Sequence, residues 1–298
     1  MKRSIHILGG RGFIGARLAA QLAAAGHRVS VSGRSRATDG RARVAEFDAL
    51  LSSHDWFVHC ASDSTPASTA NLPLAELERN LHTLVSLVDA AQRHPATRIL
   101  YLSSAGTTYA NDVTGRPQES SALAPRSYHG AAKVAAESFL QALCASNDRQ
   151  VVVLRPSNVY GPGQTPRPGF GLVATALARI RDGGTLSVFG DGSSTRDYLY
   201  VDDLVELVTR IVDSTLQPGL EVFNASHGQG YTLLEVLDIV DAITGFTLAR
   251  QFQPARAVDA LCIVPDPGRA TARFGWKART DLPEGVALTW NWIQSLPS

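Results

Sequence analysis

The feature that most constrains this chain lies at its start, where an apolar segment runs directly into a glycine-rich turn. Residues 4–8 (SIHIL) have the composition of a buried strand, and glycines follow at positions 9, 10, 12 and 15. An alanine- and leucine-rich stretch then continues to about residue 25, where Gly26 would end it as a helix. A strand that passes through a tight glycine turn into a helix opens a βαβ unit, so the sequence predicts a parallel sheet.

Strand and helix patterns go on alternating along most of the chain. The expected strands are 4–8, 28–32, 43–47, 56–61, 98–104, 151–155 and 221–225. The expected later helices are 75–93, 129–145, 171–182, 201–214 and 232–244. The link between the second strand and Asp55 is short, so beside the expected strand 43–47 any helix there would be reduced to a turn. This alternation predicts an α/β protein with a Rossmann-type, doubly wound parallel sheet and helices on both faces.

The pattern changes beyond residue 160, which indicates a second domain. Pro162, Pro166 and Pro168 lie among four glycines, and DGSSTRD (191–197) is another loop. After residue 226 one clear helix is followed by a tail that prolines interrupt. We therefore expect a dinucleotide-binding domain over 1–160, to which 198–225 returns, and a smaller, mostly C-terminal α/β substrate domain formed by 161–197 and 226–298.

Charge and cysteine content argue against several kinds of partner. The 298 residues include 28 basic and 27 acidic side chains without a block of either sign, so we expect no nucleic-acid partner. Cys60, Cys144 and Cys262 are scattered, which argues against a disulfide framework or a metal site and fits the reducing cytoplasm. Because no run of about 20 apolar residues occurs, we expect no membrane span and a cytoplasmic protein.

The glycine turn predicts a cofactor. Glycine lets the backbone approach a pyrophosphate, which then lies at the N-terminus of the following helix. A loop can be glycine-rich for turn geometry alone, but between a first strand and an amphipathic helix the pattern predicts dinucleotide binding. The expected contacts in this loop are Gly9, Arg11, Gly12, Phe13, Ile14 and Gly15.

The end of the second strand indicates which dinucleotide binds. An NAD site usually has an acidic residue there for the ribose hydroxyls, whereas this chain has Ser32-Gly33-Arg34. Arg11 and Arg34 could hold a 2′-phosphate together, so we expect NADP in preference to NAD; the alternative is that both are solvated loop arginines. Asp48, after the third expected strand, is a candidate to bind the adenine amino group, with an ordinary surface turn as the alternative.

Further motifs follow in order along nearly the whole chain. Asn80 lies on a mid-domain helix, Ser103-Ser104 closes a strand, and Lys133 lies on the helix after it. Later motifs are RPSNVYGP (155–162), FGDG (189–192), RDY (196–198), VDD (201–203), FGWK (274–277) and TW (289–290). Together they resemble the extended short-chain dehydrogenases/reductases, in particular the NAD(P)-dependent nucleotide-sugar epimerase/dehydratase family of the UDP-glucose 4-epimerase-like type.

The resemblance implies a substrate site and further cofactor contacts. The implied substrate-binding residues are Asn158, Phe189, Arg196, Arg256 and Asp259. In the family, the matching asparagine and arginines bind the diphosphate, the aspartate binds the nucleotide ribose, and the phenylalanine lines the nucleobase pocket. Forked guanidinium groups suit a diphosphate, which carries about two negative charges. The expected cofactor contacts outside the glycine loop include Ala61, Asn80 and Lys133.

The catalytic motif departs from the family's Tyr-x-x-x-Lys. Tyr128 precedes Lys133 by five residues, and His129 occupies the tyrosine position. On a helix, positions four apart differ by about 40° and positions five apart by about 140°, so His129 shares a face with Lys133. Tyr128 remains the alternative if it lies just before the helix. Ser104 is the expected hydroxyl that bonds the reacting oxygen, with Thr107 as a substitute donor. The alternative alignment, counted back from Tyr109, places Ala105 at this position.

These features predict an enzyme that epimerises a hexose, at C4, in a UDP-linked sugar through a transient ketone. One alternative is an NADPH-dependent reductase of a keto-sugar nucleotide. Another is a non-catalytic dinucleotide-binding sensor, which the missing tyrosine would favour. The family commonly dimerises through the helices matching 75–93 and 129–145, so we expect a homodimer; the alternative is that their outer apolar residues are ordinary core.

Overall fold

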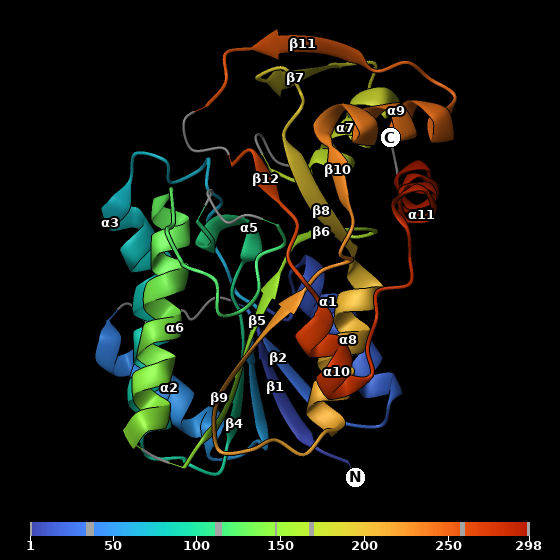
Figure 1. The fold of residues 1–298 in the computed structure, drawn as a ribbon. Coiled ribbons are helices and arrows are strands. Elements are labelled where there is room, and N and C mark those ends of the chain that lie inside the picture. The colour runs from blue at the N-terminus through green and yellow to red at the C-terminus, as the bar shows by residue number, and fades with distance from the viewer. Residues whose placement is uncertain are drawn as a thin grey trace.

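A six-stranded parallel sheet forms the larger part of the molecule (Figure 1). The computed structural model describes residues 2–33, 39–110, 115–146, 148–166, 170–256 and 260–296. The strand order is β2-β1-β3-β4-β5-β9, and every neighbouring pair is parallel. The strands are β1 (Ser4–Leu8), β2 (Arg28–Ser32), β3 (Trp56–His59), β4 (Arg98–Leu102), β5 (Gln150–Pro156) and β9 (Gly219–Ala225). This confirms the predicted doubly wound α/β architecture.

Helices cover both faces of this sheet, as the figure shows. One face packs against α1 (Phe13–Ala24), α8 (Val201–Asp213) and α10 (Gly268–Phe274). The other packs against α2 (Gly40–Leu51), α4 (His82–Ala91) and α6 (Tyr128–Ser146). Because both faces are covered, the central strands are apolar throughout rather than alternating, and Val151, Val152, Val153 and Leu154 of β5 are all buried.

The expected strand at 43–47 is wrong, because these residues lie inside helix α2. Asp39 accepts a hydrogen bond from the backbone of Ala42 and so caps the start of α2. Phe47 and Leu51, four residues apart, then bury their side chains on one face of the helix. The five-residue pattern RVAEF suits a short strand or a helical turn equally well, and packing against α4 decides for the helix. Among the described residues, the sheet therefore ends at β2.

A smaller part with its own core lies above the carboxyl ends of these strands in Figure 1. Its strands are β6 (Asn158–Tyr160), β7 (Thr185–Phe189), β8 (Thr195–Tyr200), β10 (Gly230–Thr232), β11 (Ala249–Gln253) and β12 (Cys262–Ile263). Its helices are α7 (Leu172–Arg181), α9 (Leu233–Thr244) and α11 (Leu282–Gln294). β8 pairs with β6, β10 and β12, while β7 pairs with β11.

The C-terminal tail is more regular than its prolines suggest, and part of it returns to the large sheet. Pro283 lies in the first turn of α11, where its missing N–H costs no helical hydrogen bond. Trp276, which follows α10, is fully buried in the core that α8 shares with the sheet. Ala270, Trp276 and Ala278 therefore pack with the larger part, although the sequence assigned them to the substrate domain. The domain boundaries stay predictions.

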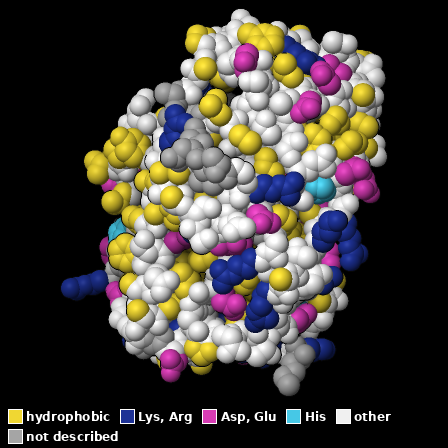
Figure 2. Space-filling view, viewed as in Figure 1, with side chains coloured by type: hydrophobic (Ala, Val, Ile, Leu, Met, Phe, Trp, Pro, Cys, Tyr) yellow, Lys and Arg dark blue, Asp and Glu magenta, His cyan; other side chains and the backbone are white. Residues whose placement is uncertain are grey.

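The surface gives two further observations. On the face shown in Figure 2, basic and acidic side chains lie interspersed, and apolar side chains gather over α3 (Pro73–Glu76). The latter side chains include the exposed Leu72, Leu74 and Leu77. None of the helices in the described ranges is long and apolar enough to cross a membrane.

Candidate active site

A cavity of about 1460 Å³ opens between the two parts of the molecule. Its wall includes the glycine turn, the ends of β3 and β4, and the start of α6 from the larger part. β7 and β8 contribute the opposite wall from the smaller part. Such a position, at the carboxyl ends of parallel strands, is where open α/β sheets bind ligands, because the loops there diverge to leave a crevice.

The glycine turn is built for close backbone approach. Gly9 has a φ of +86°, and a Cβ added there would lie 2.6 Å from the backbone nitrogen of Ala61. A Cβ on Gly15 would lie 2.2 Å from the carbonyl oxygen of Gly9, so neither position admits another residue. Helix α1 starts at Phe13 without a side-chain cap or an acidic first turn. Its first N–H groups can therefore receive an anion such as a pyrophosphate, and the turn fits a dinucleotide.

Of the two arginines expected to select the dinucleotide, the structure describes only Arg11. Arg11 is exposed and lines the cavity, whereas Arg34 lies outside the described residues. β2 ends at Ser32, whose carbonyl accepts from Gly9 and Gly10, and the first acidic residue after it is Asp39, which caps α2.

Asp48 is not placed as expected. It lies on α2, where Nε of Arg93 and Nε2 of His94 approach its carboxylate to 2.8 Å and 3.0 Å. It does not line the cavity. The prediction that it follows a strand and faces the adenine is corrected, because helix α2 replaces that strand.

Lys133 lies at the floor of the cavity. Its Nζ donates to the carbonyl oxygen of Leu102 at 2.8 Å and lies 4.8 Å from the centre of the Tyr101 ring. Burial lowers the pKa of Lys133 to about 8, although Glu76, Glu137 and Cys60 oppose the shift. A cation is thus held at the end of β4, beside the start of α6.

The structure separates the two candidates for the tyrosine position. His129 lines the cavity and is 7% exposed, whereas Tyr128 is 45% exposed and does not line it. Helix α6 begins at Tyr128, so helical geometry already applies here and turns these neighbours about 100° apart.

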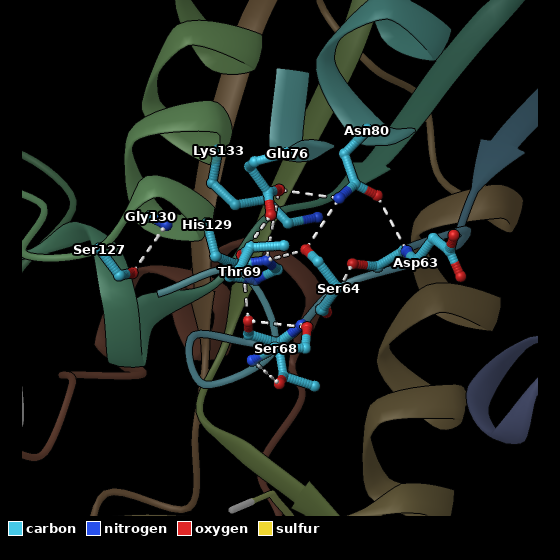
Figure 3. Close-up of polar contacts among 12 residues, drawn as sticks. Asp63, Ser64, Ser68, Thr69, Glu76, Asn80, Ser127, His129, Gly130 and Lys133 are labelled. Atoms are coloured by element: carbon cyan, nitrogen blue, oxygen red, sulfur yellow. Dashed lines mark hydrogen bonds and ion pairs between the residues drawn. The ribbon is translucent and has the colours of Figure 1, made fainter. Parts of the chain in front are cut away.

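His129 contacts a polar cluster from the chain preceding α4 (Figure 3). Its Nδ1 lies 2.8 Å from Oγ of Ser64 and 3.6 Å from Oε1 of Glu76. Burial is the main cause that lowers the pKa of His129; the charge of Lys133 acts in the same direction, while Glu76 opposes it. The imidazole is therefore neutral near pH 7 and able to accept a proton.

Two hydroxyl groups lie near the floor of the cavity. Ser104 is the residue before helix α5 (Ala105–Thr108) and lines the cavity with Thr107. The hydroxyl of Thr107 is buried, and no described residue bonds it. A buried hydroxyl without a partner is costly, which suits a group that binds a ligand oxygen.

An ion-pair network underlies this floor. Glu137 of α6 accepts from Nη2 of Arg155 at 2.6 Å and also from the hydroxyl of Ser103. All three side chains are buried. The network ties α6 to the ends of β4 and β5, and so fixes the strand end on which Ser104 lies.

The substrate residues implied by the resemblance gather on the other side of the cavity. The guanidinium of Arg256 lies 4.3 Å from the ring centre of Phe189. Arg196 donates to the carbonyl oxygens of Thr195 and Ala260, at 2.9 Å and 2.6 Å. Asn158, which also lines the cavity, donates to the carbonyl oxygen of Asp197 at 2.9 Å. Asp259 lies outside the described residues. The structure thus brings together residues from three separate stretches of the chain, around positions 158, 189–196 and 256.

Asn80 lines the cavity, but its amide is engaged by the protein. Its Oδ1 accepts from the backbone N–H of Asp63 at 2.9 Å. Its Nδ2 donates to Ser64 and to Glu76, each at 2.8 Å. The structure therefore gives Asn80 a supporting position beside His129, and its expected contact with a cofactor stays a prediction.

Sequence reasoning missed three polar residues of the cluster, Ser64, Thr69 and Glu76. Glu76 is 2% exposed, a rare environment for a glutamate. The spacing of four residues between Glu76 and Asn80 within an expected helix was a usable signal. Ser64 and Thr69 lie in an irregular segment, and no sequence pattern marks them. No group of side chains in the described ranges could hold a metal ion.

Comparison with known proteins identifies the family, whose members similar to this chain include epimerases and also a reductase of Escherichia coli. The model of the NAD dependent epimerase/dehydratase family matches residues 5–226. A UDP-glucose 4-epimerase of Mycolicibacterium smegmatis is 29% identical over 304 residues, covering 95% of this chain and 96% of that protein.

Two solved structures have the same fold. A UDP-glucose 4-epimerase of Thermotoga maritima, solved with UDP-glucose, has a TM-score of 0.89 at 27% identity and covers 98% of each chain. A Thermus thermophilus UDP-glucose 4-epimerase, solved with NAD, has a TM-score of 0.88 at 27% identity and covers 98% of this chain and 99% of its own.

Proposed function

The chain is an enzyme of the NAD dependent epimerase/dehydratase family, and from this premise we propose that it epimerises C4 of a UDP-linked hexose. One observation carries the proposal. A single cavity joins the glycine turn, the His129–Lys133 face of α6 and the arginines of the smaller part. The similarity to UDP-glucose 4-epimerases of two thermophilic bacteria supports the choice of substrate.

The glycine turn has the geometry to bind a dinucleotide, and the proposed cofactor residues lie in it and beside it. Gly9, Gly12 and the first N–H groups of α1 would hold the pyrophosphate, and Lys133 would face the nicotinamide end. When bound, a nicotinamide supplies a reversible acceptor for the hydride of the sugar carbon.

His129 is the proposed proton acceptor. Its neutral imidazole takes the proton of the C4 hydroxyl as the ketone forms, and returns it when the carbonyl is reduced. The hydroxyls of Ser104 and Thr107 bond the reacting oxygen and hold it near the ring. Lys133, as a buried cation, disfavours a second positive charge and so keeps His129 neutral.

The nucleotide end is proposed to bind the smaller part. Arg196 and Arg256 neutralise the diphosphate, and Asn158 adds an amide. The ring of Phe189, which the guanidinium of Arg256 already contacts, would stack on the nucleobase. Of the predicted set, Asp259 is assigned to the nucleotide ribose by resemblance alone.

For the cofactor, we expect NADP(H) to bind more tightly than NAD(H). The expectation depends on the absence of an acid at Ser32-Gly33 and on the charges of Arg11 and Arg34. The Thermus thermophilus enzyme, which was solved with NAD, points the other way. Calorimetric titration of both dinucleotides decides, and equal or tighter binding of NAD(H) would show that the two arginines are surface residues.

An arginine-rich cofactor site also favours a second function, reduction of a keto-sugar nucleotide by NADPH. Non-catalytic sensing is not proposed, because the chain belongs to a family of enzymes. Purified protein supplied separately with UDP-glucose and with a keto-sugar nucleotide plus NADPH distinguishes the two activities. An epimerase forms UDP-galactose without net consumption of cofactor. A reductase leaves UDP-glucose unchanged and consumes one NADPH for each keto group that it reduces to a hydroxyl.

A further inference from the structure

The polar side chains behind His129 are hydrogen-bonded to one another, and their arrangement bears on which ring nitrogen of His129 is free. The set consists of Ser64, Thr69, Glu76 and Asn80, with the backbone of Asp63 at one end (Figure 3). His129 is contacted by them only at Nδ1, and no described residue bonds Nε2.

The orientation of the Asn80 amide is fixed first. Its oxygen accepts from the backbone N–H of Asp63, which cannot act as an acceptor. Its Nδ2 must therefore be the donor to both Ser64 and Glu76. The hydroxyl oxygen of Ser64 thus receives one hydrogen bond and has one proton of its own to place.

Glu76 decides where that proton goes. Thr69 donates to Oε2 of Glu76 at 2.7 Å, and Asn80 donates to Oε1 at 2.8 Å. Although burial alone would raise the pKa of Glu76, hydrogen bonds from His129, Ser64, Thr69 and Asn80 together lower it to about 2. A carboxylate is an acceptor only, and Oε1 of Glu76 lies 3.6 Å from Nδ1 of His129, so its charge favours a proton on that nitrogen. Nδ1–H then donates to the Ser64 oxygen at 2.8 Å, and the Ser64 proton points away from the ring.

A helical irregularity places Glu76 and Asn80 for this role. Between α3 and α4 the chain makes a π-helical turn, η1 (Leu77–Leu81), which contains Asn80. The wider turn inserts an extra residue and rotates the helix that follows, a device that is frequent at functional sites. Both side chains then reach the start of α6, which packs against α3 and η1.

We propose that Glu76, whose carboxylate lies 3.6 Å from Nδ1, holds His129 in the Nδ1–H tautomer with Ser64 as the acceptor, and leaves Nε2 as the proton acceptor toward the cavity. Glu76 is thus a positioning residue that compensates for the missing tyrosine. The inference deepens the proposed function and rests on His129 as the base. In the other tautomer Nε2 would carry a proton, and the ring could not accept the proton of the sugar hydroxyl.

The direct test is nitrogen NMR of the full chain labelled with ¹⁵N-histidine, in which the two ring nitrogens report their protonation separately. The chain has eight histidines, and a His129→Asn variant identifies the signals of His129. In the unmutated protein near neutral pH, we expect Nδ1 protonated and Nε2 bare. A spectrum in which Nε2 is protonated and Nδ1 is not would overturn the proposed tautomer, independently of any activity that the enzyme shows.

A variant pair then tests the role of the carboxylate. Glu76→Gln removes the charge and adds a donor, so we expect Nε2–H to become populated and kcat to fall about 100-fold, with KM changed less than about twofold. Glu78→Gln is the matched control, because Glu78 is exposed two residues along the same helical segment, and it should change neither quantity. A Glu76→Gln variant with the tautomer and kcat of the parent would refute the role of Glu76.

Two further comparisons keep the outcome unambiguous. If Glu76→Gln does not fold, Ser64→Ala removes only the hydroxyl that contacts Nδ1 of His129 and should shift the same NMR signals. If the parent turns over no UDP-sugar but shows the Nδ1–H tautomer, the proposed epimerase function fails while the assignment of Glu76 stands.

Discussion

At the residue scale, His129 has the largest consequence for chemistry, because it occupies the tyrosine position of the family's Tyr-x-x-x-Lys motif. We expect His129→Ala to lose about 10²–10⁴-fold in turnover while it still binds cofactor, because it removes a general base and leaves the glycine turn intact. Tyr128→Phe should retain activity, since Tyr128 is exposed and outside the cavity lining. Steady-state kinetics of the two variants measure this. If Tyr128→Phe lost turnover and His129→Ala retained it, Tyr128 would be the catalytic residue.

The pH dependence of the same residue follows from its surroundings. Burial and Lys133 lower the pKa of His129 below 6.5, so the base is neutral above that value and becomes protonated only in more acidic solution. We expect kcat/KM to be constant from about pH 7 down to about pH 6.5 and to fall at lower pH. An acid limb with a midpoint above 6.5 would contradict the assignment, because it would require a raised pKa.

At the element scale, one buried ion pair joins α6 to two strands. Glu137→Leu leaves Arg155 charged and buried without its partner, and such a loss typically destabilises a protein by about 3–5 kcal/mol. Unfolding in urea measures the change. The double variant Glu137→Leu/Arg155→Met should recover most of it, since no unpaired charge remains. A cost below about 1 kcal/mol for the single variant would show that water or another group compensates Arg155.

At the scale of the whole molecule, the exposed apolar side chains on the α6 side suit a second copy of the chain. Phe139 of α6 is 42% exposed and Leu77 of η1 is 49% exposed, and these elements pack against each other. We expect a homodimer through α4 and α6, which Phe139→Asp converts to a monomer in analytical ultracentrifugation. Phe246→Asp is the control, because Phe246 is exposed at the end of α9 in the smaller part. A parent protein that sediments as a monomer at micromolar concentration would refute this surface.

What the sequence alone determined is local in character. The turn at Gly9–Gly15 depends on backbone conformations that only glycine tolerates, and the shared face of His129 and Lys133 follows from helical spacing. Packing decided the rest. Residues 43–47 became helix because Phe47 and Leu51 bury against α4. The Ser64–Glu76 cluster reaches His129 across more than fifty residues of chain, and no local pattern encodes such a contact. Only the folded molecule brings an acceptor carboxylate and an imidazole together, because burial then forces each polar group to find its partner.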